Sequence, residues 1–185
     1  MQTRRREQNP RAYWSGVESD PHVKPNPPVE LNALLDMVGD SSVLDFGCGF
    51  GRLADHFKDY LGVDIANHRI EIAKRIYPDK EFRYVADVRE LDGFGGVRDV
   101  AICCDVLLHI PDDDIAMVVS TLARSARRVV VAEHLGRDWR GPDFHREKTE
   151  YEEIFGLVGL MPGRTREVLN PRYGEFLTVM EFDEP

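Results

Sequence analysis

The sequence has few cysteines and no long apolar run, and these two features limit the classes of protein to which the chain can belong. Its three cysteines, Cys48, Cys103 and Cys104, are odd in number and form no C-x-x-C pair. Neither a disulfide framework nor a zinc site is therefore indicated. No apolar stretch approaches the roughly 18 residues of a membrane span, and the polar start does not resemble a signal peptide. We expect a protein of the reducing cytoplasm with no membrane segment.

Basic residues are also scarce relative to acidic ones. Lys and Arg number 24 against 33 Asp and Glu, and the formal net charge is −9. Nucleic-acid binding depends largely on clustered Lys and Arg, so this balance argues against a nucleic-acid partner. The length of 185 residues, with 42% hydrophobic content, suits one globular domain with a sizeable core.

Residues 1–28 are polar and proline-rich, and we expect them to form an irregular arm or lid ahead of a single domain over residues 29–185. Two aromatic residues, Tyr13 and Trp14, stand out in this arm. They either anchor the arm on the core or close over a ligand, since aromatic side chains in mobile segments often close pockets.

The chain is organised around VLDFGCGFGR at Val43–Arg52. Its first four residues predict a short buried strand, the glycines predict a tight loop, and a helical pattern begins at Arg52. Backbone N–H groups at a helix start can hold an anionic or polar ligand. Glycine permits the positive-φ turns and the close ligand approach that such a loop needs. The spacing is G-x-G-x-G, with Arg52 where a dinucleotide-binding loop carries its third glycine.

Apolar periodicity predicts alternating strands and helices along the rest of the chain. Helices are expected at Val29–Val38, His68–Tyr77 and Asp112–Arg124, and around Tyr151, Ile154, Phe155 and Val158. Further strands are expected at Tyr60–Ile65, Glu81–Asp87, Asp99–Asp105 and Arg128–Glu133, with a closing hairpin at Arg164–Leu169 and Glu175–Phe182. This order predicts an α/β fold with a mainly parallel sheet and an antiparallel edge.

With these motifs in place, the sequence resembles the class I S-adenosylmethionine-dependent methyltransferases, in particular those of small-molecule type. The resemblance runs from Val29 to the C-terminus and is most specific in VLDFGCGFGR and DVAICCDVLLHIPDD. Between these two motifs, Asp64 and the V-A-D at Val85–Asp87 occur in family order. The family resemblance implies a Rossmann-like three-layer sandwich whose seven-stranded sheet has an antiparallel C-terminal hairpin strand. It also implies S-adenosylmethionine as cofactor, S-adenosylhomocysteine as product, and methyl transfer to a small-molecule acceptor.

The resemblance implies roles for residues around the methionine and ribose of the cofactor. Asp45 would orient the glycine loop or receive the methionine amino group. The backbone at Gly47, Cys48 and Gly49 would lie under the methionine and ribose. Asp64 would bind both ribose hydroxyls, although the same carboxylate also suits an ordinary helix cap.

Further residues would contact the adenine and the sulfur end of the cofactor. Ile65 would pack on the adenine, and Asp87 would accept a hydrogen bond from its exocyclic amine. Val88 would present a backbone amide beside Asp87. Cys104, just past the fourth strand, would touch the methionyl part.

Methyl transfer needs few catalytic groups from the protein, because its rate depends mainly on alignment of the acceptor with the S–CH₃ bond and on exclusion of water. A general base matters only if the acceptor is protonated at neutral pH. His109 and His134 are the candidate catalytic residues, because both follow C-terminal strand ends, where open α/β sheets place their ligands. His109 equally suits a role in holding its own loop.

The loop Gly136–Glu147 is polar but contains aromatic residues, among them Trp139. With Tyr13 and Trp14 it is expected to form the acceptor pocket. Its three arginines either pair with a carboxylate or phosphate on the acceptor or are simply solvated. These are Arg137, Arg140 and Arg146.

Other classes match the motifs less well. A nicotinamide dehydrogenase would need G-x-G-x-x-G, which the loop lacks. Nucleic-acid methyltransferases carry an N-P-P-Y-type fourth motif, and protein arginine methyltransferases a paired-glutamate loop; we find neither. Metal-dependent O-methyltransferases place acids near Asp105, Glu133 and His134, but their Asp-Asn pair is absent, so we expect no metal. A non-catalytic S-adenosylmethionine-binding subunit would keep the same motifs.

Overall fold

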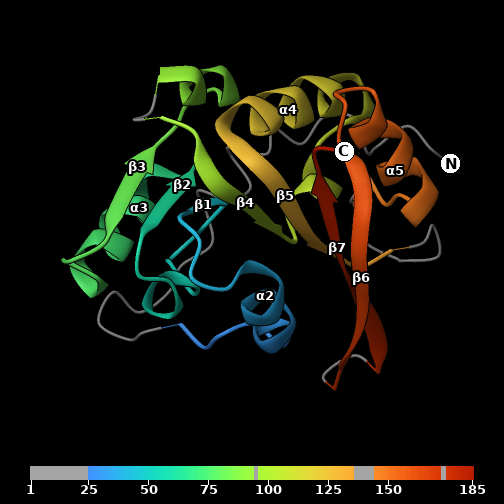
Figure 1. The fold of residues 1–185 in the computed structure, drawn as a ribbon. Helices are drawn as coiled ribbons and strands as arrows, with labels where there is room; N and C mark the ends of the chain where they lie inside the picture. The colour runs from blue at the N-terminus through green and yellow to red at the C-terminus, as the bar shows by residue number, and fades with distance from the viewer. Residues whose placement is uncertain (1–24, 94–95, 136–143, 172–173) are drawn as a thin grey trace, which may run out of the picture.

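The computed structural model describes residues 25–93, 96–135, 144–171 and 174–185, so most of the predicted arm lies outside it. A seven-stranded sheet in the order β3-β2-β1-β4-β5-β7-β6 runs through the described part (Figure 1). The strands are β1 (Val43–Phe46), β2 (Tyr60–Asp64), β3 (Glu81–Tyr84), β4 (Arg98–Cys104), β5 (Ala126–Glu133), β6 (Met161–Asn170) and β7 (Glu175–Asp183). The five strands from β3 to β5 pair in parallel, whereas β7 is antiparallel to both β5 and β6. The predicted sheet and its closing hairpin are confirmed.

Helices cover both faces of the sheet, as the alternation of buried residues requires. They are α2 (Leu31–Val38), α3 (Asn67–Ile76), α4 (Asp112–Ser125) and α5 (Lys148–Gly156), with 3-10 turns η1 (Ala54–His56), η2 (Val88–Gly93) and η3 (Leu107–His109). In β4, Val100 and Ile102 face α2 and α3, whereas Ala101 and Cys103 face α4 and α5. The result is the predicted three-layer sandwich (Figure 1).

Two predicted elements are shorter in the structure. The helix expected from Arg52 is only the turn η1, because Gly51 has a φ of 79° and Phe57 is already extended, leading directly into β2. The apolar residues of this segment are buried, which imitates helical periodicity. The strand expected over Glu81–Asp87 ends at Tyr84, because Asp87 accepts a hydrogen bond from the Arg89 N–H and turns the chain into η2.

The hairpin of β6 and β7 extends past the C-terminal end of β5 (Figure 1). Glu133, the last residue of β5, pairs with Thr178, so β7 begins beyond that end. There Leu169 and Phe176 pair across the hairpin, and each is more than half exposed. An apolar pair therefore stands beside the edge at which the parallel strands end.

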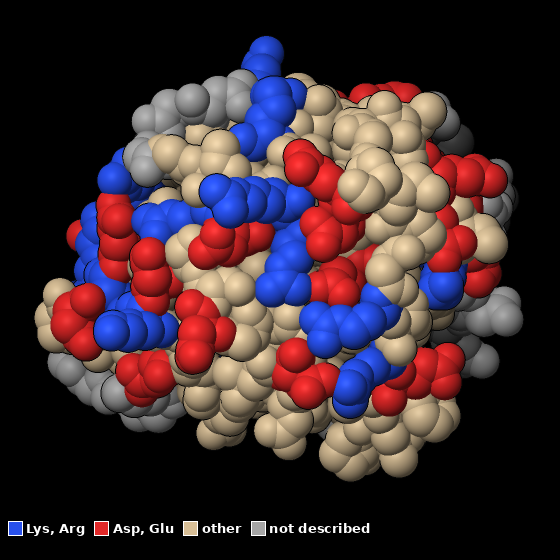
Figure 2. Space-filling view, viewed as in Figure 1, with Lys and Arg blue, Asp and Glu red and all other residues tan. Residues whose placement is uncertain are grey.

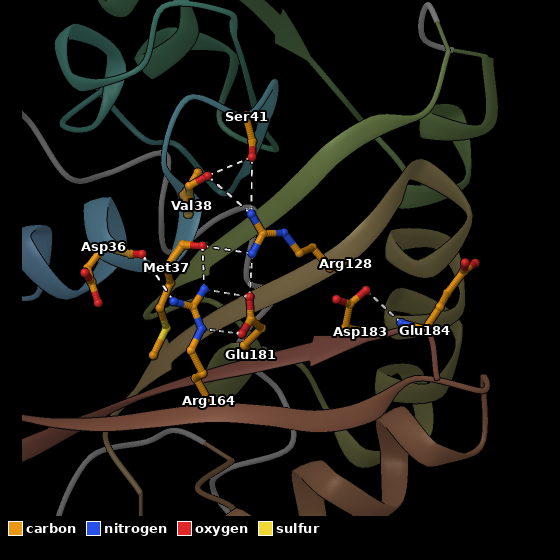
Figure 3. Close-up of polar contacts among 9 residues, drawn as sticks. All are labelled: Asp36, Met37, Val38, Ser41, Arg128, Arg164, Glu181, Asp183 and Glu184. Atoms are coloured by element: carbon orange, nitrogen blue, oxygen red, sulfur yellow. Dashed lines mark hydrogen bonds and ion pairs between the residues drawn. The ribbon is translucent and has the colours of Figure 1, made fainter.

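The C-terminal end of α2 is fixed to the sheet by three charged side chains, of which only Glu181 is buried (Figure 3). Arg128 of β5 donates to Met37 O and Val38 O, and Arg164 of β6 also donates to Met37 O. Both arginines pair with Glu181 of β7. We call Arg128, Arg164 and Glu181 the α2 clamp; it satisfies carbonyl groups that a helix end leaves without partners.

The surface shows mixed charge on the face drawn in Figure 2, where Lys and Arg alternate with Asp and Glu and no broad basic region is seen. Within the described ranges, no helix has the length and apolar character to cross a membrane.

Candidate functional site

The candidate site lies at the C-terminal edge of the parallel strands, which we call the rim. Strands β1, β2, β4 and β5 run in the same direction, so the loops that follow them meet at this edge. Open α/β sheets bind their ligands there. The predicted site residues that the structure describes lie in or after these strands and β3: Asp45, Gly47, Cys48, Gly49, Asp64, Ile65, Asp87, Val88, Cys104, His109 and His134.

The glycine loop after β1 needs its glycines for conformation and for space. Gly47, Gly49 and Gly51 have φ values of 78°, 56° and 79°, which side chains rarely adopt. A Cβ on Gly47 would lie 2.4 Å from Cγ2 of Val106. The glycine loop and the segment after β4 are therefore in direct contact.

The amides of this loop are used by the protein itself. The N–H groups of Gly47 and Cys48 donate to Val63 O at 2.8 and 3.0 Å, and the Gly49 N–H donates to Asp64 Oδ2 at 2.8 Å. The expectation of free amides at a helix start is wrong, because η1 is a three-residue turn and the loop satisfies these donors internally. The loop is held in shape before a ligand arrives.

Asp64, the last residue of β2, links the loop to the start of α3. Its Oδ1 accepts a hydrogen bond from the Ala66 N–H at 2.7 Å, while Oδ2 holds Gly49. The residue is 8% exposed. Each carboxylate oxygen has a second lone pair, so Asp64 can still accept hydrogen bonds from a ligand.

Asp45 is a buried carboxyl group two residues before the loop. Its Oδ2 accepts a hydrogen bond from the Tyr60 hydroxyl at 2.6 Å. Burial raises the pKa of Asp45 to about 6, against the lowering effects of Tyr60 and Arg52. This group therefore changes charge close to neutral pH.

Apolar and acidic groups follow β2 and β3. Ile65 is 37% exposed, and Val88 is half-buried at the start of η2. Asp87 Oδ1 accepts hydrogen bonds from the Arg89 N–H at 3.0 Å and from its Nε at 2.8 Å, and the two side chains form an ion pair. A ligand that uses Asp87 must share it with Arg89.

Two cysteines lie in the walls of the site. Cys48 and Cys104 are both buried, and burial raises the pKa of each thiol well above its usual value. Both are thiols at neutral pH and contribute by packing.

Sequence reasoning did not predict that three charged residues meet at the rim: Glu30, Arg52 and Asp105, which we call the rim cluster. Arg52 Nη2 lies 3.8 Å from Glu30 Oε1 and 3.5 Å from Asp105 Oδ2. Glu30 is 2% exposed, and burial raises its pKa against the lowering effect of Arg52. The charge of His134 also acts on Glu30, so this histidine lies near the cluster.

Asp105 directly follows β4 with a φ of 54°, the one positive value at a non-glycine residue in the described ranges. Such a conformation costs on the order of 1–3 kcal/mol and persists only where the surroundings fix it. Backbone strain of this kind is common at functional sites. The corner after β4 is therefore held in place by other residues.

A comparison with protein families adds to this geometry. Residues 43–128 match the model of a family described as "Methyltransferase domain". That span includes the glycine loop, Asp64, Asp87 and the segment after β4. The chain contains a class I S-adenosylmethionine-dependent methyltransferase domain. The family predicted from the sequence motifs is confirmed.

Solved methyltransferase structures share the fold of this domain. The magnesium protoporphyrin IX methyltransferase of Synechocystis PCC 6803, with bound S-adenosylhomocysteine, is 22% identical with a TM-score of 0.67, over 84% of this chain and 80% of that one. The N-methyltransferase NodS of Bradyrhizobium japonicum WM9, in complex with S-adenosylhomocysteine, is 18% identical with a TM-score of 0.70, over 95% and 96%. The 1,6-didemethyltoxoflavin-N1-methyltransferase of Burkholderia thailandensis is 19% identical with a TM-score of 0.65, over 83% and 76%. No curated protein sequence matches the chain significantly.

The predicted catalytic histidines of the methyltransferase domain lie on adjacent loops. His109 ends η3, after β4, and His134 directly follows β5. His145 Nδ1 lies 3.4 Å from His134 O, so the chain returns to this point after its next loop. The predicted substrate-binding residues lie outside the described ranges: Tyr13, Trp14 and Trp139.

Arg146 does not face an acceptor. It is 3% exposed and donates to three main-chain carbonyl groups and to Asp112. Both alternatives given for it, pairing with an acceptor anion and solvation, are wrong, because Arg146 is buried and its donors are used within the fold. The other two arginines of that loop, Arg137 and Arg140, lie outside the described ranges.

Glu133, one of the acids that the sequence analysis considered for a metal site, binds the main chain instead. Glu133 is fully buried, and its Oε1 accepts the N–H groups of Val106 and Leu107. Across the part of the chain that the structure describes, no group of three or more His, Cys, Asp or Glu is placed to hold a metal ion.

Proposed function

We propose that this methyltransferase domain binds S-adenosylmethionine at the rim and methylates a small-molecule acceptor by in-line displacement. The observation that carries the proposal is the link between Asp64 and the glycine loop. The Asp64 carboxylate is fixed by the Gly49 and Ala66 N–H groups at 2.8 and 2.7 Å, and it retains acceptor capacity. Such a carboxylate, at the end of β2 beside a glycine loop, suits a ribose with two hydroxyl groups.

The residues that would hold the adenine follow from the same arrangement. Ile65 has exposed apolar surface at the tip of β2, and Val88 lies at the start of η2. They would pack against the base and offer a backbone amide. Asp87 would accept from the exocyclic amine while it keeps its bond to the Arg89 N–H.

The methionine end would lie between the glycine loop and β4. Gly47, Cys48 and Gly49 would line one side, and Cys104 the other. When bound, S-adenosylmethionine supplies a methyl group activated by a sulfonium cation. Asp45 would accept its amino group, and a carboxyl group that ionises near pH 6 can do so at neutral pH.

Charge at the rim supports the same assignment. Among the described residues there, the carboxyl groups of Asp45, Asp64, Glu30 and Asp105 outnumber the guanidinium groups of Arg52 and of Arg69, which lies over Phe50. An acidic rim favours a cationic sulfonium and an ammonium group, and Arg52 offers a cation suited to the cofactor carboxylate.

For the acceptor we propose His134, with His109 as the alternative, as the group that takes a proton when the acceptor is an amine or hydroxyl. Tyr13, Trp14 and Trp139 would close the acceptor pocket, next to the exposed apolar pair on the hairpin. The net charge of −9 disfavours nucleic acid, and the names of two similar structures specify small-molecule acceptors. The cytoplasmic location expected from cysteine usage stays a prediction.

The test is calorimetry with S-adenosylhomocysteine. Asp64→Ala should weaken binding by roughly 1–3 kcal/mol, because hydrogen bonds to a charged acceptor are lost. Asp59→Ala is the matched control, since Asp59 lies at the opposite end of β2 and pairs with Arg98. If the wild type binds a nicotinamide dinucleotide and neither S-adenosyl compound, the proposal is wrong.

A further inference from the structure

The loop after β4 is held by a buried carboxyl group on one side and a buried guanidinium group on the other. This loop, residues 105–111, contains the strained Asp105, Val106 in contact with the glycine loop, and the turn η3 that ends at His109. Two side chains from outside the loop bind its main chain: Glu133 at the N-terminal side and Arg146 at the C-terminal side.

Glu133 is the last residue of β5 and has no exposed surface. Its Oε1 accepts the N–H of Val106 at 3.0 Å and that of Leu107 at 2.7 Å. These two N–H groups stand at the start of η3, where a helical turn offers them no main-chain acceptor of its own. Burial and the neighbouring Asp105 raise the pKa of Glu133 well above its usual value. A glutamine keeps the shape of this side chain and an oxygen that can accept both N–H groups.

Arg146 comes from the segment before α5 and is 3% exposed. Its Nη1 donates to Leu107 O at 3.0 Å, and its Nη2 donates to Ile110 O at 2.8 Å and to Asp112 Oδ1 at 2.7 Å. The planar fork of the guanidinium thus joins η3 to the first residue of α4. Removal of Glu133 would take the acceptor from two main-chain N–H groups, and removal of Arg146 would take side-chain donors from the carbonyl groups of Leu107 and Ile110.

Val106 connects the loop after β4 to the glycine loop, on the side where the cofactor would bind. Val106 Cγ2 lies 2.4 Å from the position that a Cβ on Gly47 would take, so a shift of the loop would press on or release the glycine loop. The strained φ of Asp105 shows that the corner does not relax to an ordinary conformation by itself.

We propose that Glu133 and Arg146 are positioning residues for methyl transfer, which fix the loop after β4 against the glycine loop. This inference rests on the proposed function, because it assumes that the cofactor lies between these two loops. Neither residue touches the reacting atoms in this assignment; both act through the main chain of residues 106–110.

The experiment compares two buried carboxyl groups on adjacent strands: Glu133 at the end of β5, and Glu181 of β7, which pairs with Val130. Glu133→Ala should weaken S-adenosylhomocysteine binding about tenfold, as expected when one or two hydrogen bonds to the ligand are misplaced. Glu181→Ala is the matched control: it breaks the α2 clamp, whose arginines bind the C-terminal end of α2 and not the loop after β4, and should lower the unfolding temperature without changing this affinity. Glu133→Gln should restore the affinity to that of the wild type, because its amide oxygen still accepts both N–H groups.

Hydrogen exchange adds a direct readout of the loop. In Glu133→Ala the amides of Val106 and Leu107 should exchange faster, whereas β2 amides should stay protected. Arg146→Lys, which keeps the charge but loses the fork, should also weaken binding and serves if Glu133→Ala does not fold.

Several results would overturn this inference. Wild-type affinity in a folded Glu133→Ala or Arg146→Lys protein would do so, as would a Glu133→Gln protein that binds as weakly as the alanine variant. A wild-type protein that binds no S-adenosylhomocysteine at all would instead contradict the proposed function.

Discussion

At Asp45, burial and two neighbours act in opposite directions on one carboxyl group. Burial raises its pKa, while the Tyr60 hydroxyl and the Arg52 guanidinium lower it, and the balance lies at about 6, above the usual 3.8. Between these two values the folded state binds a proton that the unfolded state has already released. Stability from this group is therefore complete at low pH and is lost as pH rises towards 6.

The change Asp45→Asn removes this dependence. Because asparagine stays neutral, we expect the variant to be more stable than the wild type at pH 7, by roughly 1–3 kcal/mol, and equally stable near pH 4. Urea unfolding at the two pH values measures the difference. Asp59→Asn, on the exposed end of β2, is the control. An equal offset at both pH values would contradict the assigned pKa.

The same variant separates two roles of Asp45 that the sequence left open. If the carboxylate receives the cofactor amino group, Asp45→Asn weakens S-adenosylhomocysteine binding but not binding of 5′-methylthioadenosine, which lacks that group. If Asp45 only orients the loop, both ligands lose affinity together.

At the scale of elements, the sequence predicted strands better than short turns. A buried parallel strand is a continuous apolar run, which is visible in β4 and β5 without further context. The segment after Gly51 was misread because Leu53, Ala54 and Phe57 are buried for packing and not as one face of a helix. The spacing of apolar residues in a sequence indicates which side chains are buried. In a short connection between strands, buried side chains do not require a helix.

The α2 clamp makes a prediction about one element. Its two arginines, Arg164 more than Arg128, hold the pKa of Glu181 below its usual value of 4.5, so its stabilising effect is present at neutral pH and is lost as pH falls below 4.5 and through the lower pKa of the folded state. Glu181→Gln should therefore lower the free energy of unfolding by about 1–3 kcal/mol at pH 7, through weaker bonds to both arginines. Chemical denaturation measures it. A loss that is undiminished at pH 3 would contradict this account.

At the scale of the whole molecule, the sequence predicted the residues that belong to one local motif. The glycine loop and the acids after β2 and β3 are recognisable because each stands at a fixed distance from its own strand. The rim cluster is different: Glu30, Arg52 and Asp105 come from three segments, and only the folded sheet brings them within 4 Å of one guanidinium nitrogen. Arg146 was misassigned for the same reason, since its carbonyl partners lie in another loop.

The acceptor side gives the last prediction. His134 directly follows β5, its charge acts on Glu30, and the exposed Leu169 and Phe176 stand beyond the same strand end. A base at this position would act on the acceptor and not on the nucleoside. With an acceptor that is protonated at neutral pH, His134→Ala should lower turnover about a hundredfold and leave S-adenosylhomocysteine affinity within about twofold of the wild type.

The measurement uses labelled S-adenosylmethionine with the small-molecule fraction of a cell lysate, followed by assay of the methylated product. His56→Ala is the matched control, because His56 is an exposed histidine in η1. A pH profile separates the two candidate bases. Removal of the true base abolishes the rise in rate with pH, whereas removal of a histidine that only holds its loop lowers the rate at every pH. Full turnover in His134→Ala would indicate that His109 is the base or that the acceptor needs no base.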